Sequence, residues 1–295
     1  MWQAIINRFS ALKIGHAICK HRLMAAIIFK GAKHMNINHI PATKVRADDG
    51  ISIRQVGTNI ILDWLHAGVT DIHLGGRASL FYGIIFAAIG VIIHTVFADN
   101  YWLLAGVSTG FFLLGPFLAV GLYDLSRRIE SGERPSLRPT LTAWLPNLLN
   151  ITLFTGLLIF VFLSWVRLSM SIFAHYFHDA LPTFADVVIN VFTFKQPTFL
   201  FVYFSAGAVF AAFIFSISVI AMPLMLDRNA SAWTAAITSL RTCAHNPVPM
   251  ILWAFCIVVL VGFGLATNFL GLILTMPVVG HASWHVYRDL IAIKN

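Results

Sequence analysis

The fold is decided by the stretch TCAHNPVPMILWAFCIVVLVGFGLATNFLGLILTMPVVGHASWHVY, residues 242–287, which contains no Asp, Glu, Lys or Arg. The hydrocarbon core of a bilayer takes about 20 apolar residues for each helical crossing. This stretch is therefore long enough to cross twice, with a turn at Gly262, Gly264 and Asn268. In lipid every backbone polar group must be satisfied internally, and for uninterrupted apolar segments only helices achieve this. We therefore predict an all-α integral membrane protein.

Composition supports this prediction. The chain is 58% hydrophobic and 11% charged, with 25 Phe and 8 Trp in 295 residues, whereas soluble domains average about 25% charged residues. The formal net charge of +8 does not indicate nucleic acid, because the basic residues flank apolar segments. Membrane lipid is the expected partner. The cysteines Cys19, Cys243 and Cys256 have no metal-ligand spacing and give no disulfide framework.

Apolar runs and polar breaks predict six transmembrane helices. The expected spans are residues 78–97, 102–123, 148–166, 199–226, 248–265 and 269–284. The less apolar stretch 167–197, between the third and fourth spans, is expected to form an interfacial helix in the outer leaflet. Six crossings place both termini on one side of the membrane.

The distribution of basic residues predicts which side that is. Of the 20 Lys and Arg, only Arg167 and Lys195 fall on the face opposite the termini. Lys and Arg accumulate on the cytoplasmic side of membrane proteins. We therefore expect the N- and C-termini to be cytoplasmic and the protein to be a multi-pass protein of the cell inner membrane.

The first 50 residues differ from the remainder, so the expected domains are an arm, 1–50, and a transmembrane domain, 51–295. No acidic residue occurs between Met1 and Ala47, and apolar residues recur at helical spacing from Trp2 to Leu12. A basic amphipathic helix of this kind is suited to an anionic leaflet, and it also resembles an organelle transit peptide. A surface-lying arm or a poorly ordered extension is the simpler interpretation.

An internal repeat is suggested by the end of every second span. Pro116, Pro223 and Pro277 each precede a charged, Asp- and Arg-containing segment. A tryptophan-containing amphipathic segment precedes each hairpin, at residues 58–72, 136–146 and 230–244. The pattern predicts three parallel repeats of a surface helix and a transmembrane hairpin. Because proline removes a helical hydrogen bond, the three prolines are expected to be structural kinks, either opening a vestibule or only adapting helices for packing.

Two histidine clusters are the candidate metal sites. His281 and His285 are four residues apart and share a helix face, so both can face one metal ion or haem edge, or they can have a hydrogen-bonding role. The second cluster contains His175, His178, Asp179 and Asp186. In it His175, His178 and Asp179 can chelate one metal ion, or the group is simply a solvated face. Two histidines do not complete a zinc site, and no bound cofactor is expected.

The predicted spans contain no Asp, Glu, Lys or Arg away from their ends. Ion-coupled transporters place such groups inside the membrane, and the sequence also lacks the hydrolase elbow, the phosphate loop and the HExxH motif. We therefore predict that the protein is not an enzyme. Small and hydroxylated residues in the spans indicate close helix packing.

Three sets of motifs resemble a known family. They are Asp63-Trp64-Leu65 with Gly68 and Asp71; Gly115-Pro116 with Gly121-Leu122-Tyr123-Asp124, Ser126-Arg127-Arg128 and Glu130-Ser131-Gly132-Glu133; and Gly280-His281-Ala282-Ser283-Trp284-His285 with Tyr287-Arg288-Asp289. Over residues 51–291 the chain resembles the bacterial integral membrane family filed as domain of unknown function 2189. The resemblance implies a six-span inner-membrane protein without an established activity. The arm 1–50 departs from what the resemblance implies.

Three functions remain compatible with these observations. The first is a non-catalytic accessory or assembly subunit of an inner-membrane complex, such as a respiratory complex, with other membrane subunits as partners. The alternative is a channel or carrier for a neutral or lipid-like small molecule. Haem or metal handling through His281 and His285 is a weaker alternative.

Overall fold

The computed structural model describes residues 51–97, 106–108, 111, 115–177 and 196–293. The chain divides into two compact units, Met1–Pro41 and Ala42–Asn295. The predicted arm, residues 1–50, and the whole segment 178–195 lie outside the described residues. The description below concerns the second unit.

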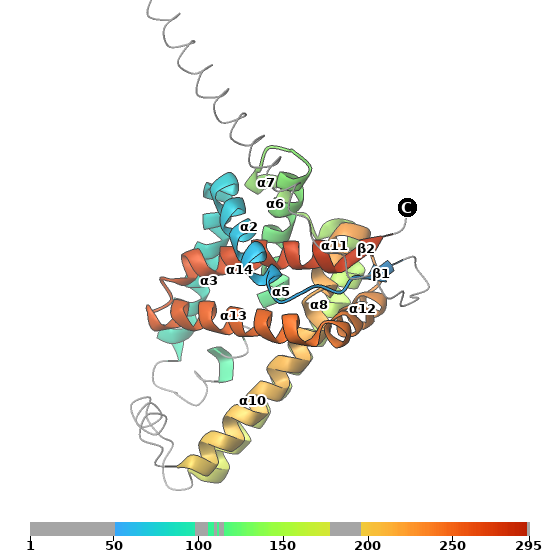
Figure 1. Ribbon diagram of the computed structural model, residues 1–295. Helices are drawn as coiled ribbons and strands as arrows, with labels where there is room; N and C mark the ends of the chain where they lie inside the picture. The colour runs from blue at the N-terminus through green and yellow to red at the C-terminus, as the bar shows by residue number, and fades with distance from the viewer. Residues whose placement is uncertain (1–50, 98–105, 109–110, 112–114, 178–195, 294–295) are drawn as a thin grey trace, which may run out of the picture. The chain divides into compact units, whose positions relative to one another are not determined.

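This unit is largely helical, as predicted (Figure 1). Its elements are β1 (Ile51–Ile53), α2 (Ile60–Gly75), α3 (Arg77–Val96), α5 (Gly115–Leu118), α6 (Val120–Glu130), α7 (Leu137–Thr140), η1 (Leu145–Asn147), α8 (Leu148–Tyr176), α10 (Pro197–Ser218), α11 (Ala221–Arg228), α12 (Ala232–His245), α13 (Pro247–Ala266), α14 (Leu272–Leu290) and β2 (Ile291–Ile293).

A short antiparallel strand pair was not expected from the sequence. β1 pairs with β2 in the register Ile51 to Ile293, and the Arg54 amide extends the pairing with a bond of 2.8 Å to the Leu290 carbonyl. The segment before α2 is thereby fixed to the end of α14. Three-residue strands carry too little sequence pattern to be predicted, because an alternating period needs at least four residues to appear.

Four segments of the described residues are long and apolar enough to cross a membrane. They are Arg77–Val96, Leu137–Tyr176, Pro197–Arg228 and Pro247–Ala266. They confirm four of the six predicted spans. The span predicted at residues 102–123 falls largely outside the described residues. The sixth predicted span corresponds to α14. This segment is a helix, but the polar side chains in its second half make it less apolar than the four segments above.

One predicted boundary is wrong. We expected the third span to end at residue 166, with a separate interfacial helix beginning at Arg167, but α8 continues without a break to Tyr176. The Arg167 side chain is exposed, and a long basic side chain can extend to the membrane surface from within a helix. A single arginine therefore does not end the helix.

Helix α14 is the centre of one group of helices, since it packs against α2, α3, α6 and α13 (Figure 1). The approach of α2 is close because Gly68 faces α14. A Cβ atom at this position would lie 2.9 Å from both the Ala282 nitrogen and the Val278 oxygen, closer than real Cβ contacts. The absence of a side chain at Gly68 sets the spacing of these two helices.

Helices α8 and α10 form a second packed pair. Trp165 of α8 contacts the rings of Tyr203 and Phe210, each at a centroid distance of 5.5 Å. Phe173 contacts Phe199 farther along the pair, at 5.2 Å. The opposite faces of both helices expose large apolar side chains, as expected of helices in lipid.

Two of the three predicted surface segments form helices of 14 residues or more. Helices α2 and α12 occupy the first and third, whereas residues 136–146 contain only the short helix α7, a turn and the start of η1. The threefold repeat therefore stays a prediction. Of the three prolines, Pro116 is the second residue of α5, Pro223 follows the break between α10 and α11, and Pro277 lies inside α14.

Candidate functional site

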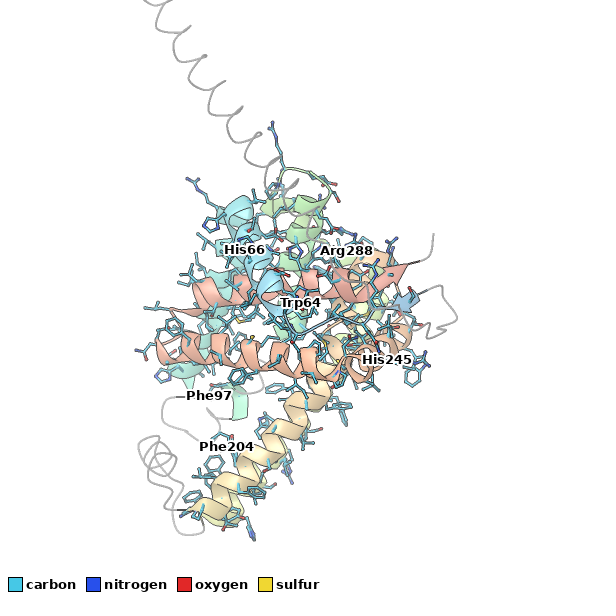
Figure 2. The ribbon with its side chains drawn as sticks, viewed as in Figure 1. Trp64, His66, Phe97, Phe204, His245 and Arg288 are labelled. Carbon is cyan, nitrogen blue, oxygen red and sulfur yellow. The ribbon has the colours of Figure 1, made fainter. Side chains whose placement is uncertain are left out.

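Most polar side chains in the second half of α14 are bonded to neighbouring helices. Figure 2 shows the side chains around this helix, with Trp64 and Arg288 labelled. The indole of Trp64 donates to Asp289 at 2.8 Å, and the hydroxyl of Tyr287 donates to Asp227 at 2.8 Å. Because each bond joins α14 to a different element, this half of the helix organises α2 and α11 around it.

The most buried part of this network is a chain of four side chains from four helices. Ser126 of α6 donates to Asp71 of α2 at 2.5 Å, and its oxygen lies 2.7 Å from Nδ1 of His281 on α14. Nε2 of His281 lies 2.8 Å from the hydroxyl of Ser79 on α3. Ser79 and His281 are fully buried, and Asp71 and Ser126 are nearly so. We call these four residues the polar chain.

The tautomer of His281 follows from the number of hydrogens in the polar chain. A carboxylate only accepts, so the single hydroxyl hydrogen of Ser126 is used on Asp71. The Ser126 oxygen must then accept from Nδ1 of His281, which leaves Nε2 without a hydrogen. Nε2 accepts from the Ser79 hydroxyl. The neutral Nδ1–H form of His281 satisfies every donor in the chain.

His285 connects the polar chain with the surface. Its Nε2 lies 2.9 Å from the same Asp71 oxygen that accepts from Ser126, and its side chain is 26% exposed, whereas that of His281 is 0% exposed. The two histidines therefore share Asp71, one directly and one through a serine. Protonation of His285 makes the contact with Asp71 an ion pair.

Two acidic groups extend the network toward the end of α14. Glu130 of α6 accepts from the Trp284 indole at 3.1 Å and from Arg288 at 3.0 Å. Burial raises the pKa of Asp289, and the hydrogen bond from Trp64 opposes that shift. These contacts fix α2 and α6 to the last two turns of α14.

A buried carboxylate stabilises the adjoining part of α6. Asp124 is 0% exposed and accepts from Arg127 and from Arg128, the latter at 2.8 Å. The hydrogen bond to Asp124 is the main cause that raises the pKa of Arg128. Arg127 also donates to the Leu226 carbonyl at 3.3 Å, near the C-terminus of α11. One carboxylate thus positions both arginines, and Arg127 joins α6 to α11.

The predicted metal site does not fit this geometry. His281 and His285 do share one helix face, but both ring nitrogens of His281 are occupied by serine hydroxyls. Within the described ranges, no group of three or more His, Cys, Asp and Glu is placed to hold a metal ion. The pair has the hydrogen-bonding role that the sequence left open. Of the second cluster only His175, near the end of α8, is described, since His178, Asp179 and Asp186 lie outside the described residues.

Asp71, Ser79 and Ser126 are the residues of the polar chain that sequence reasoning did not select as site residues. Asp71 and Ser126 belong to the motifs that carry the family resemblance, and this was the available signal. The sequence gives no such signal for Ser79, because a serine near the start of an apolar helix usually has only a packing role. The structure brings these residues together although more than 200 positions separate Ser79 from His281.

The apolar helices and the internally paired polar groups define an integral membrane protein. The model of a family described as predicted integral membrane protein (DUF2189) matches residues 103–227, which confirms the family resemblance for that part of the chain. The match includes Asp124 and Ser126, but Asp71, Ser79 and His281 lie outside it. No curated protein matches the chain, and no solved structure matches it.

Proposed function

We propose that this protein is a non-catalytic accessory or assembly subunit of an inner-membrane complex. The observation that carries the proposal is the contrast between its two kinds of surface. The reactive side chains around α14 are bonded to one another and buried, whereas the apolar helices expose broad faces. Among the described residues, the apolar helices therefore offer packing surface, while Ser79 and His281 are not accessible.

The exposed faces favour partners. On α13, Ile251, Phe255 and Val258 are each about two-thirds exposed, at 67%, 64% and 66%. Phe204 of α10 and Phe160 of α8 are exposed at 58% and 68%. Large side chains can face lipid tails, but they also fill the surface of a neighbouring helix through van der Waals packing. We assign these faces to helices of other subunits.

The lack of charge in the apolar helices supports a non-transporting role. Among the described residues of α3, α8, α10 and α13, the Asp, Glu, Lys and Arg side chains are Arg77, at the first position of α3, and Arg167. Coupled transport needs ionisable groups within the membrane. A substrate must also be able to reach a catalytic group. The full burial of Ser79 and His281 therefore supports a non-enzymatic function.

Two close contacts between helices support the proposed six crossings. Gly121, at the start of α6, faces Tyr82 near the start of α3, where a Cβ would lie 2.1 Å from the tyrosine hydroxyl oxygen. This contact supports the proposed return across the membrane between Val96 and Gly121. Near the other end, Gly264 of α13 faces Leu272 of α14, so α14 returns alongside α13.

The strand pair supports the same topology. Because β1 and β2 are paired, the residues before the first crossing and those after the last lie on one side, and the number of crossings between them is even. The excess of Lys and Arg on that side favours the cytoplasm.

Photo-crosslinking in native membranes tests the proposal. A photoreactive residue at Phe255, Phe204 or Phe160 is expected to capture a defined membrane protein, and affinity capture in mild detergent should recover the same protein in stoichiometric amount. The matched control is Trp253, which is 0% exposed on the same helix as Phe255 and should give no intermolecular product. Crosslinks to lipid alone, with a monodisperse protein that purifies by itself, would contradict the proposal. Flux of neutral solutes through reconstituted vesicles would instead favour the carrier.

A further inference from the structure

A side chain of α12 replaces one backbone hydrogen bond at the junction of α10 and α11, the two helices against which α12 packs (Figure 1). In an uninterrupted helix the Ile220 amide would donate to the Ser216 carbonyl, four residues earlier. Here the Ile220 amide donates to the hydroxyl oxygen of Ser239 at 3.2 Å, and that hydroxyl donates to the Ser216 carbonyl at 2.8 Å. Ser239 is therefore inserted as a bridge into the backbone of another helix.

The junction is bent by its own sequence as well. Pro223 has no N–H, so the Val219 carbonyl four residues earlier has no donor in the helical pattern. The hydroxyl of Ser218 donates to the Ile214 carbonyl at 2.6 Å, and bonds of this kind often bend helices. A side chain that enters the backbone ladder is a further cause of a sharp bend. Ser239 differs from these local causes because it connects the bend to a separate helix.

Helix α12 carries its hydroxyl groups on the buried face. Thr238 is nearly buried and Ser239 and Thr242 are fully buried, whereas Trp233 and Leu240 are 75% and 51% exposed. In water a surface helix turns its polar side chains outward. The reversed arrangement indicates that the outer face of α12 meets an apolar environment.

The position of α12 in the chain identifies that environment as the edge of the lipid layer. Helix α12 joins two segments that are long and apolar enough to cross a membrane, Pro197–Arg228 and Pro247–Ala266. Its 14 residues extend about 21 Å, which is less than the hydrocarbon core of about 30 Å, so α12 lies at a membrane surface. An exposed tryptophan such as Trp233 is typical of that region. The exposed Arg241 forms none of the ion pairs among the described residues, so its guanidinium group is available to a lipid phosphate.

We propose that α12 binds lipid with its outer face and, through the hydroxyl of Ser239, holds the segment Pro197–Arg228 bent where α10 meets α11. Trp233 and Leu240 lie among the upper acyl chains, and Arg241 binds a headgroup phosphate. Lipid that holds α12 in place thereby also sets the direction in which α10 leaves the bend. The inference does not depend on the accessory role proposed above, since α12 is not among the faces assigned to other subunits.

Quenching of tryptophan fluorescence tests the lipid contact. The full chain is reconstituted in phospholipid vesicles with and without bromine on the upper acyl chain, and the Trp233 signal is the difference between the wild-type protein and Trp233→Phe. Brominated lipid is expected to quench most of this signal. The matched control is the signal removed by Trp253→Phe, which should respond much less because Trp253 is fully buried.

Two results of the quenching experiment would overturn the proposal. Quenching of Trp233 by water-soluble acrylamide and not by brominated lipid would place the outer face in water. Protection from both quenchers would place it against another protein chain.

Double electron–electron resonance tests the role of Ser239. Spin labels are attached to a ketone-bearing amino acid at Phe204 of α10 and at the exposed Glu133 after α6, which leaves the native cysteines in place. Ser239→Ala should shift or broaden the distance distribution by several ångström, because a change of about 20° in a bend moves a point about 20 Å along the helix by about 7 Å.

Thr242→Val is the matched control for Ser239→Ala. It removes a hydroxyl from the same buried face without a change of shape, and that hydroxyl donates within α12, to the Thr238 carbonyl at 2.7 Å. The distance distribution of this variant should equal that of the wild-type protein. An unchanged distribution in Ser239→Ala, or an equal change in both variants, would overturn the assignment of the bend to Ser239.

Discussion

The carbonyl oxygen of Ile273 lies against Gly83, where α3 and α14 cross, and a Cβ atom at Gly83 would be 2.1 Å from it. Pro277 stands four residues after Ile273 inside α14 and has no N–H with which to bond that carbonyl. The proline therefore releases a carbonyl oxygen at the position where the glycine provides space. This gives Pro277 a packing role at a helix crossing, in agreement with one of the two alternatives that the sequence left open.

Gly83→Ala is expected to destabilise the protein. The added methyl group cannot fit without separating α3 from α14, and overpacking of this kind costs about 1–3 kcal/mol. Thermal unfolding in detergent, followed by gel filtration of the heated sample, measures the effect. Gly156→Ala is the matched control, because nothing lies within 4 Å of a Cβ at Gly156 on the same kind of apolar helix. Equal unfolding temperatures for the two variants would refute the close crossing.

Asp124→Asn is expected to lower the unfolding free energy by about 2–4 kcal/mol, because two arginines lose their buried charged partner. The neighbouring carboxylate of Glu133 also contacts Arg128, but it is 55% exposed. Its replacement, Glu133→Gln, should change stability by less than about 1 kcal/mol. The comparison uses the same unfolding assay, and a larger loss for Glu133→Gln than for Asp124→Asn would contradict the assigned roles.

Cys243 is expected to resist alkylation in the folded protein. Burial raises the pKa of its thiol to about 12, and the thiolate is the nucleophile. At pH 8 the thiolate fraction should be lower by a factor of about a thousand than that of an ordinary thiol. The rate should increase tenfold for each pH unit as far as about pH 11, because the thiol stays protonated up to that point.

The measurement for Cys243 needs a chain in which Cys19 and Cys256 are replaced by Ala. Labelling with iodoacetamide is followed by mass spectrometry before and after denaturation in SDS. Rapid reaction of the denatured chain provides the internal control. A folded protein that reacts at the same rate at pH 8 would show that the thiol is not buried as described.

Hydropathy was sufficient to predict α3, α8, α10 and α13, because lipid imposes a length and a composition on each crossing. The end of α8 was predicted wrongly since Arg167 was read as a boundary, although an exposed arginine on a helix need not interrupt it. Helix α14 was recognised as a helix, but its second half is stabilised by polar contacts with four elements. Its composition alone does not distinguish such a helix from one that lies at the surface.

The candidate site was predicted only in part. Helical spacing placed His281 and His285 on one face, and this is what the structure shows. Their common partner, Asp71, comes from α2, and the serines that complete the polar chain come from α3 and α6. Contacts between distant segments leave no period or spacing in a single sequence. The histidine pair was therefore visible from the sequence, whereas the role of each histidine was not.

Topology mapping tests the central claim most directly, namely that the chain crosses the membrane an even number of times and assembles the polar network of α14 on one side. Single cysteines at Gly132, after α6, and at Asn229, after α11, are labelled in intact cells and in inverted vesicles with a membrane-impermeant maleimide. Both are expected to react from the same side as a cysteine appended at the C-terminus, and a cysteine at Asn268, between α13 and α14, from the opposite side. Labelling of position 268 from the same side as position 229 would contradict the account.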